Sequence, residues 1–341
     1  MKIKRLLSVF AAGTVALSLA LTGCADGKAK SENTGDNSSG GKKVAFVPKI
    51  QGIPFFEAMN RGGEDAAKDG NFEWVYKGAT TADPAAQADV VRSLIQQKVD
   101  ALIVAPNDPD SMAPLLKQAQ DAGIHVLTAD TDAPDSVREA FVNQASEEGI
   151  GKALVDELVK PMGDEGEIAI VSCGQTAANL NAWIDVAKKY VEADLPKIKI
   201  VDVVYADEDE DKAVTMAKNL MNAHPNLKGL IGPCTTAAPG IARAVDETNN
   251  IGKVYTVGVG TPKAMAPYLE SGASSASVLW DVENAGYLAA WVGNQLASDK
   301  PLEASMEAGR IGTVKYDDAS KVVLLGDPLI LTKDNVGNYD Y

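Results

Sequence analysis

The fold of this chain is decided by residues 101–132, which read ALIVAPNDPDSMAPLLKQAQDAGIHVLTADTD. Two largely apolar runs, Ala101–Ala105 and His125–Ala129, flank a stretch with helical periodicity over Ser111–Ala122. Near-continuous apolar runs are typical of parallel strands that are covered on both faces. A strand, a helix and a second strand within about 30 residues therefore predict a βαβ unit in an open parallel sheet.

The same alternation extends through the chain from Lys43 onward. Further strands are predicted at Val44–Ile50, Phe72–Lys77, Ile168–Cys173, Ile198–Tyr205, Leu227–Gly232, Val254–Val259 and Ala276–Trp280. Helical patterns lie between them, at Pro84–Lys98, Glu147–Lys160, Ala177–Glu192, Asp211–Ala223 and Val282–Ala297. The units fall into one group before Asn143 and one after Gly166, which predicts an α/β fold with two lobes, each an open parallel sheet flanked by helices. A closed eightfold barrel is the competing interpretation of this pattern.

The composition of the 341 residues excludes several classes of function. A net charge of −15 argues against nucleic-acid binding, which relies on clustered Lys and Arg. Only two histidines are present, so His-rich metal sites and Ser-His or Cys-His catalysis are not expected. The three cysteines form no CxxC pair, which excludes a zinc ribbon. We therefore expect no catalytic residues, no metal and no cofactor, and hence a protein that is not an enzyme.

The first 24 residues have the pattern of an export signal. Residues 1–5, MKIKR, carry three positive charges and precede an apolar stretch, Leu6–Leu21, that is short for a transmembrane span. The stretch ends in Leu-Thr-Gly-Cys24, which resembles a bacterial lipobox, so residues 1–23 are expected to be removed and Cys24 to be lipidated. Residues 24–42 are rich in Gly, Ser, Asn and charge, which is typical of a flexible tether. The protein is thus expected at the cell membrane, held by lipid on the extracytoplasmic face.

Polar and aromatic residues gather where the predicted strands end. Ligands of open α/β sheets bind outside the carboxyl ends of the strands. Such positions hold Lys49, Phe55, Phe56, Asp130, Asp132, Asn179, Thr235, Trp280 and Asp281. Carboxylates, amides, hydroxyls and aromatic faces together suit a small, polyhydroxylated ligand. For any single polar position, a helix cap or a turn residue is the competing interpretation.

Two acidic motifs do not support calcium binding or catalysis. Asp207, Asp209 and Asp211 are spaced like the start of a calcium loop, but the required glycine and closing acid are missing. Acids that favour the N-terminus of a helix explain them better. Asp130 and Asp132 lie two residues apart in a turn and cannot face each other across a scissile bond as glycosidase carboxylates do.

Two tryptophans and two cysteines are open to more than one interpretation. Trp183 and Trp291 lie at helical positions beside apolar neighbours, which favours core packing over a binding role. Cys173 and Cys234 lie near predicted strand ends. A disulfide between them and two buried free thiols are both possible in an exported protein.

A set of motifs resembles one protein family over about residues 43–341. The lipobox, the polar tether and the two α/β lobes resemble the substrate-binding lipoproteins of ABC importers, in the type I ribose-binding-like superfamily. Eight motifs resemble the autoinducer-2-binding (Lsr-type) and rhamnose-binding branch of that superfamily. They are VAFVPK at 44–49, GIPFF at 52–56, VLTADTD at 126–132, NQ at 143–144, NAW at 181–183, GP at 232–233, LWDV at 279–282 and NVGNYDY at 335–341. No single motif carries the resemblance; the set does.

The resemblance implies site residues beyond those found at strand ends. Lys49, Asp130 and Pro233 match the autoinducer-2 pattern. The pair Asn179-Leu180 stands where the best-known receptors have Asp-Gln, and Thr235 stands where they have alanine. These departures remove a carboxylate and an amide that would hold ligand hydroxyls, although Asn179 and Thr235 restore part of the polarity.

The ligand that the resemblance implies is autoinducer-2 or a similar small sugar-like molecule. Asp281 is like the autoinducer-2 branch, whereas AGRIG at 308–312 and Asp327-Pro328 are more like the rhamnose-binding branch. Rhamnose or another monosaccharide is therefore the alternative ligand. A ligand sensor without transport is the alternative function of another class.

The resemblance also implies a receptor whose two ribose-binding-protein-like lobes close about a hinge. The expected N-terminal lobe comprises residues 43–143 and 282–310, and the C-terminal lobe comprises 147–279 and 311–341. The expected partners are the sugar-like ligand, an ABC permease and the membrane, and the expected state is a monomer. A repressor of similar fold would need a helix-turn-helix and a basic surface, which this sequence lacks.

Overall fold

The βαβ unit predicted from residues 101–132 is present in the computed structural model. β3 (Ala101–Val104) and β4 (His125–Ala129) pair in parallel and are joined by α3 (Pro109–Asp121). The helix begins two residues before the predicted start at Ser111, because the Asp108 carboxylate accepts a hydrogen bond from the Ser111 amide at 2.7 Å and a proline occupies the first turn.

The first sheet contains eight strands in the order β11-β12-β13-β5-β4-β3-β1-β2. Neighbouring strands are parallel except in the pairs β11/β12 and β12/β13. The other elements of this lobe are β1 (Lys43–Val47), α1 (Pro54–Gly70), β2 (Glu73–Tyr76), α2 (Pro84–Gln97), β5 (Ala140–Asn143), α9 (Val282–Ala297), β11 (Ser305–Glu307), η1 (Gly309–Ile311), β12 (Thr313–Asp317) and β13 (Val322–Leu324).

The second sheet contains six strands in the order β14-β10-β9-β8-β6-β7, and only the edge strand β14 is antiparallel to its neighbour. Two separate open sheets confirm the two-lobe α/β fold and exclude a single closed barrel. The elements of this lobe are α4 (Glu147–Met162), β6 (Gly166–Ser172), α5 (Ala178–Asp194), β7 (Ile198–Tyr205), α6 (Glu210–Ala223), β8 (Leu227–Gly232), α7 (Ala237–Glu247), β9 (Tyr255–Gly258), α8 (Pro262–Ser271), β10 (Ala276–Leu279), β14 (Leu329–Leu331) and η2 (Val336–Asn338).

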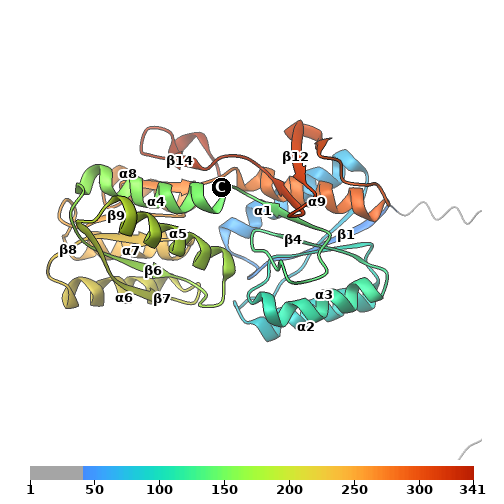
Figure 1. Ribbon diagram of the computed structural model, residues 1–341, viewed down its shortest axis with the longest axis horizontal. Helices are drawn as coiled ribbons and strands as arrows, with labels where there is room; N and C mark the ends of the chain where they lie inside the picture. Colours follow the sequence, from blue (N-terminus) through green and yellow to red (C-terminus); the bar gives the residue numbers. More distant parts are fainter. Residues whose placement is uncertain (1–40) are drawn as a thin grey trace, which may run out of the picture. The chain divides into compact units, whose positions relative to one another are not determined.

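Helices cover both faces of each sheet (Figure 1). In the first lobe, α1 and α9 pack together on one face, and α2 and α3 cover the other. The α1–α9 crossing is close because it is built on glycine: a Cβ at Gly62 would lie 1.8 Å from the Glu283 carbonyl oxygen, and one at Gly286 would lie 1.9 Å from the Met59 carbonyl oxygen. In the second lobe α4 packs on α5, and α6 packs on α7.

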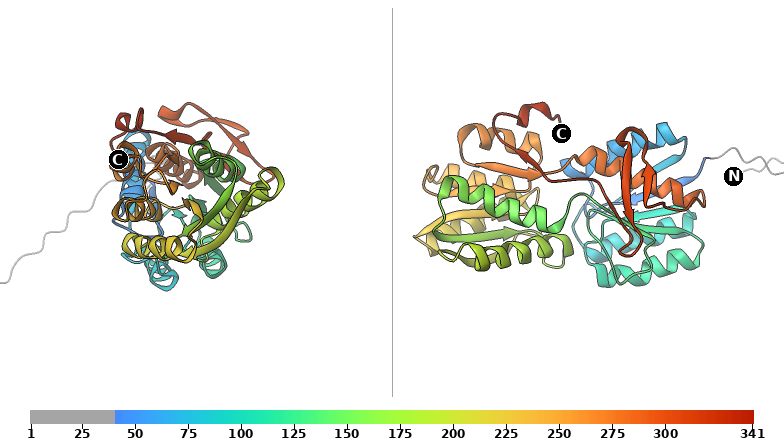
Figure 2. Two further views of the ribbon diagram at one scale, coloured as in Figure 1. Left: turned by 90° about the vertical axis from the view of Figure 1, so that its left-hand side faces the viewer. Right: turned by 45° about the horizontal axis from the view of Figure 1, so that its top comes forward.

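The chain passes between the two sheets three times (Figure 2). Two crossings lie between β5 and α4 and between β10 and α9, near residues 143–146 and 280–281. The third was expected after about Arg310 but lies between β13 and β14. Because β13 pairs with β5, residues 313–324 belong to the first lobe, and the expected boundary at residue 311 is wrong.

The structure describes residues 41–341. The predicted signal peptide at 1–23, the predicted lipidation site Cys24 and all but the end of the predicted tether lie outside the described residues. Within residues 41–341, no helix has both the length and the apolar character needed to cross a bilayer.

Candidate functional site

The carboxyl ends of strands from both sheets surround one cavity. Its empty space amounts to about 340 Å³ when the open mouth is counted. Nine of the predicted site residues line it: Lys49, Phe55, Phe56, Asp130, Asn179, Leu180, Pro233, Thr235 and Trp280. Five further lining residues were not among the predicted ones: Ile53, Trp183, Glu208, Cys234 and Val259.

A buried polar cluster joins the two lobes at this cavity. Lys49 follows β1, and its ammonium lies 3.3 Å from the Asp130 carboxylate and 2.9 Å from the Asn179 side-chain oxygen. Asp130 follows β4 in a left-handed turn with φ of 63°, and Asn179 lies in the first turn of α5 in the other lobe. All three side chains are less than a tenth exposed. Because the Lys49 charge is neutralised by Asp130, the pair can remain buried.

The ends of the first-lobe strands are held by a side chain that the sequence did not single out. Gln87 on α2 is fully buried and donates hydrogen bonds to the carbonyl oxygens of Pro48 and Ala105, at 2.9 and 2.8 Å. Its oxygen accepts from the Asn107 amide at 2.9 Å, and the Asn107 side chain donates to the Lys49 carbonyl oxygen at 2.8 Å. This network fixes the backbone that carries Lys49.

An aromatic cluster forms another part of the wall. Phe55 and Phe56 at the start of α1 make an edge contact with ring centroids 4.9 Å apart. Trp280, which follows β10, makes edge contacts with Phe55 at 5.7 Å and with Trp183 of α5 at 5.8 Å. Trp183 was predicted as a core residue, and it is buried, but it also lines the cavity. Edge-to-face rings of this kind form a rigid apolar surface for a ligand.

Glu208 brings a second acid to the cavity, from the end of β7. Asp207 and Glu208 both adopt left-handed backbone conformations, with φ of 53° and 59°, and this turn separates β7 from α6. A Glu208 carboxylate oxygen accepts a hydrogen bond from the Thr236 hydroxyl at 3.2 Å. Burial raises the pKa of the Glu208 carboxyl above its usual value, although the nearby Lys49 charge opposes this shift. Asp209 caps α6, and Asp211 lies in its first turn, so these two acids serve the helix start as predicted.

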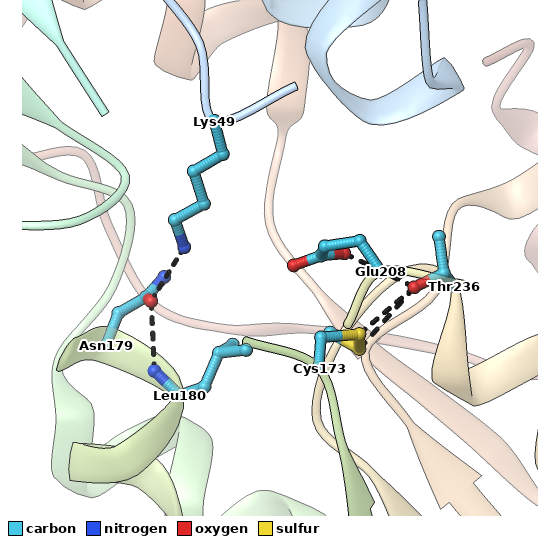
Figure 3. The surroundings of a disulfide bond; sticks show 7 residues. Lys49, Cys173, Asn179, Leu180, Glu208 and Thr236 are labelled. Atoms are coloured by element: carbon cyan, nitrogen blue, oxygen red, sulfur yellow. Dashed lines mark hydrogen bonds between the residues drawn. A yellow bond between two sulfur atoms is a disulfide. The ribbon is translucent and has the colours of Figure 1, made fainter. Parts of the chain in front are cut away.

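Cys173 and Cys234 form a disulfide beside Glu208 (Figure 3). The bond joins residues that follow the neighbouring strands β6 and β8, with Cα atoms 6.2 Å apart, a usual separation for a disulfide. The pairing that the sequence left open is therefore observed. Both sulfur atoms lie close to the Glu208 carboxylate, but because they bond each other they are not available as metal ligands.

Two predicted site residues do not line the cavity. Asp132 accepts a hydrogen bond from Thr128 at 2.7 Å and forms an ion pair with the buried Arg138. Asp281 caps α9, where its carboxylate accepts from the Asn284 amide at 2.9 Å. For both residues the competing interpretation, a turn or a helix cap, describes the contacts observed.

The sequence and the structure are similar to those of known solute-binding proteins. Residues 44–301 match the family described as "Periplasmic binding protein domain". The D-ribose/D-allose-binding protein of Pseudomonas aeruginosa is 28% identical over 239 residues, which cover 67% of this chain and 74% of that protein. The structure of LsrB from Clostridium saccharobutylicum in complex with AI-2 is similar with a TM-score of 0.83 at 28% identity, over 88% of this chain and 100% of that chain.

A solute-binding protein of an ABC transporter from Clostridium phytofermentas, solved with bound L-rhamnose, is also similar, with a TM-score of 0.83 at 26% identity. That similarity covers 88% of this chain and 98% of the other chain. The family match extends over most of the chain, and both structural relatives share its whole described fold. The chain belongs to the periplasmic binding protein family.

Proposed function

We propose that this protein is the extracytoplasmic receptor of an ABC importer and binds autoinducer-2 or a similar small, sugar-like ligand. The observation that carries the proposal is the cavity between the lobes, where buried polar groups and a rigid aromatic surface face the same small volume. Carboxylate and amide oxygens accept from ligand hydroxyls, the lysine donates, and aromatic rings pack against the C–H face of a sugar.

Direct contacts between the lobes support a mechanism of hinge closure. Lys49 of the first lobe bonds Asn179 of the second, and the Thr176 hydroxyl donates to the Asn107 carbonyl oxygen across the same gap at 3.0 Å. A ligand between the lobes adds contacts to both walls at once. It therefore binds the closed state more tightly than the open state and shifts the population toward closure.

The choice of ligand rests on the two structural relatives and on the departures within the site. One relative was solved with AI-2 and the other with L-rhamnose. Lys49, Asp130 and Pro233 keep the pattern expected of an autoinducer-2 receptor, and all three line the cavity. Rhamnose or another monosaccharide is the alternative ligand. The lipid anchor at Cys24 and the monomeric state are proposals from the sequence alone.

Calorimetric titration of the purified protein tests the proposal. Autoinducer-2, L-rhamnose, D-ribose and D-allose are titrated separately, and heat with autoinducer-2 but not with the others is expected. Asp130→Asn removes the carboxylate beside Lys49 and is expected to weaken binding by about 10-fold or more, whereas Asp110→Asn on the exposed start of α3 leaves it unchanged. An absence of heat with all four ligands refutes the proposal.

Transport is tested separately from binding. Deleting the gene is expected to abolish uptake of the ligand identified by calorimetry. Unchanged uptake, together with retained binding by the purified protein, would show a ligand sensor and not an importer component.

A further inference from the structure

We infer that Glu208 is a specificity-determining residue of the cavity, which selects an uncharged, hydroxyl-bearing ligand and excludes anionic ligands such as sugar phosphates and sugar acids. This inference rests on the proposed function, because it assumes that the ligand occupies the cavity between the lobes. It adds to that function that the ligand is uncharged.

The backbone turn and a hydrogen bond hold Glu208 in its position at the cavity. A left-handed turn at Asp207 and Glu208 begins two residues after the end of β7, and two consecutive non-glycine residues rarely adopt this conformation. Glu208 lines the cavity on the second-lobe side, where Thr236 holds one of its oxygens at 3.2 Å. In Figure 3 the other carboxylate oxygen points away from Thr236, on the side that faces Lys49. That oxygen is placed to meet a ligand.

The charges of the cavity wall give Glu208 its selectivity. Lys49 is the one cation among the lining residues within 41–341, and Asp130 already neutralises it at 3.3 Å. No cation of the described chain lies within ion-pair distance of Glu208, and the nearby acids Asp130 and Asp207 disfavour a negative charge on it. An anionic ligand would thus bring its charge close to two acids in a region of low dielectric, which is strongly unfavourable.

Glu208 meets the ligand with its second carboxyl oxygen. Because Thr236 donates to one oxygen, the other is left to bond a ligand hydroxyl. Glu208→Gln keeps the shape of the side chain and one acceptor oxygen but removes the ionisable acid, whereas Glu208→Ala removes the whole group.

The test compares Glu208→Gln and Glu208→Ala with wild type, and Glu192→Gln and Glu192→Ala on the exposed surface of α5 serve as controls. Each neutral sugar that binds wild type is titrated, together with D-ribose 5-phosphate and L-rhamnonate as anionic probes. Glu208→Gln is expected to bind the neutral ligand within about threefold of wild type, and Glu208→Ala about 10- to 100-fold more weakly. Neither anionic probe binds wild type, and removal of the acid in Glu208→Gln increases their affinity.

Two results overturn the inference. Glu208→Ala that binds the neutral ligand like wild type shows that the residue does not contact the ligand, and anionic probes that stay excluded from Glu208→Gln show that the acid does not exclude them. If no neutral sugar binds wild type, the proposed function fails, and a gain of anion binding in Glu208→Gln over wild type still shows that the acid at this position excludes anions.

Discussion

Loss of the Cys173–Cys234 bond is expected to destabilise the second lobe. The two residues are separated by 61 positions, so the closed loop begins just after β6 and contains α5, β7, α6 and β8. Closing a loop of that length in the unfolded chain removes conformational entropy equivalent to about 4 kcal/mol at 25 °C. Because β6 and β8 are already paired neighbours in the sheet, the bond adds little to the folded state and acts mainly on the unfolded state.

The assay is unfolding in urea, applied to the oxidised protein, to the protein reduced with dithiothreitol, and to the double variant Cys173→Ala/Cys234→Ala. The last two are expected to lose about 4 kcal/mol of unfolding free energy relative to the first. Agreement between reduction and substitution assigns the loss to the bond, since only the variant also removes sulfur from the core. Hydrogen exchange then locates the effect, with β6 and β8 losing protection and β1 and β3 keeping theirs.

Oxidised and reduced protein that unfold at the same urea concentration with the same slope would show that the bond does not stabilise this lobe. An equal fall of protection in both lobes would also contradict the prediction, because the bond closes a loop in only one of them. A loss confined to the double variant would show that packing of the two sulfur atoms, and not the covalent link, stabilises this lobe.

Three further predictions concern the cluster and the packing described above. Lys49→Met leaves the buried Asp130 carboxylate without a cation and should lower the unfolding free energy by about 3–5 kcal/mol in urea, and adding Asp130→Asn should recover part of that loss. Gly286→Ala places a methyl group against the α1 backbone and should destabilise by about 3 kcal/mol, whereas Gly326→Ala, with open space around it, should change stability by less than about 0.5 kcal/mol; thermal unfolding checks both. The pKa of Glu208 is raised in the folded state, so on raising the pH the unfolded chain releases this proton before the folded protein does. As the pH rises above the ordinary value of 4.5, the unfolding free energy of wild type should therefore fall relative to that of Glu208→Gln, which has no such group.

The fold was predictable wherever local pattern and long-range pairing agree. The apolar run Ala101–Val104 and the cap at Asp108 identify a strand and a helix start without knowledge of any partner. The strands Ser305–Glu307 and Val322–Leu324 have three residues each, too few to show a period. They are strands because of their partners, as in the pairing of Val322–Leu324 with β5. The sequence alone therefore assigned Val322–Leu324 to the wrong lobe, although it assigned Ser305–Glu307 to the right one.

The site was predictable only in part, for a related reason. The rule that ligands bind at strand ends locates Lys49, Asp130 and Asn179, because each follows an apolar run closely. Glu208 lies in a series of acids that reads as a helix start, and only the backbone turn at 207–208 sets it apart from its neighbours. Gln87 had no local signal, since its partners at Pro48 and Ala105 come from two other segments of the chain.

Because the first lobe is built from separate segments of the chain, its parts are synthesised and can fold only in a fixed order. Residues 147–279 emerge from the ribosome as one stretch and contain every strand of the second sheet except its edge strand β14. The first sheet cannot be completed until later. Helix α9 covers the face of β1 and β3, strand β13 pairs with β5, and both are synthesised only after residues 147–279. The earliest residues of the described chain are thus among the last to be buried. A nascent chain that pauses before residue 297 presents an uncovered apolar sheet face, the kind of surface on which chaperones act.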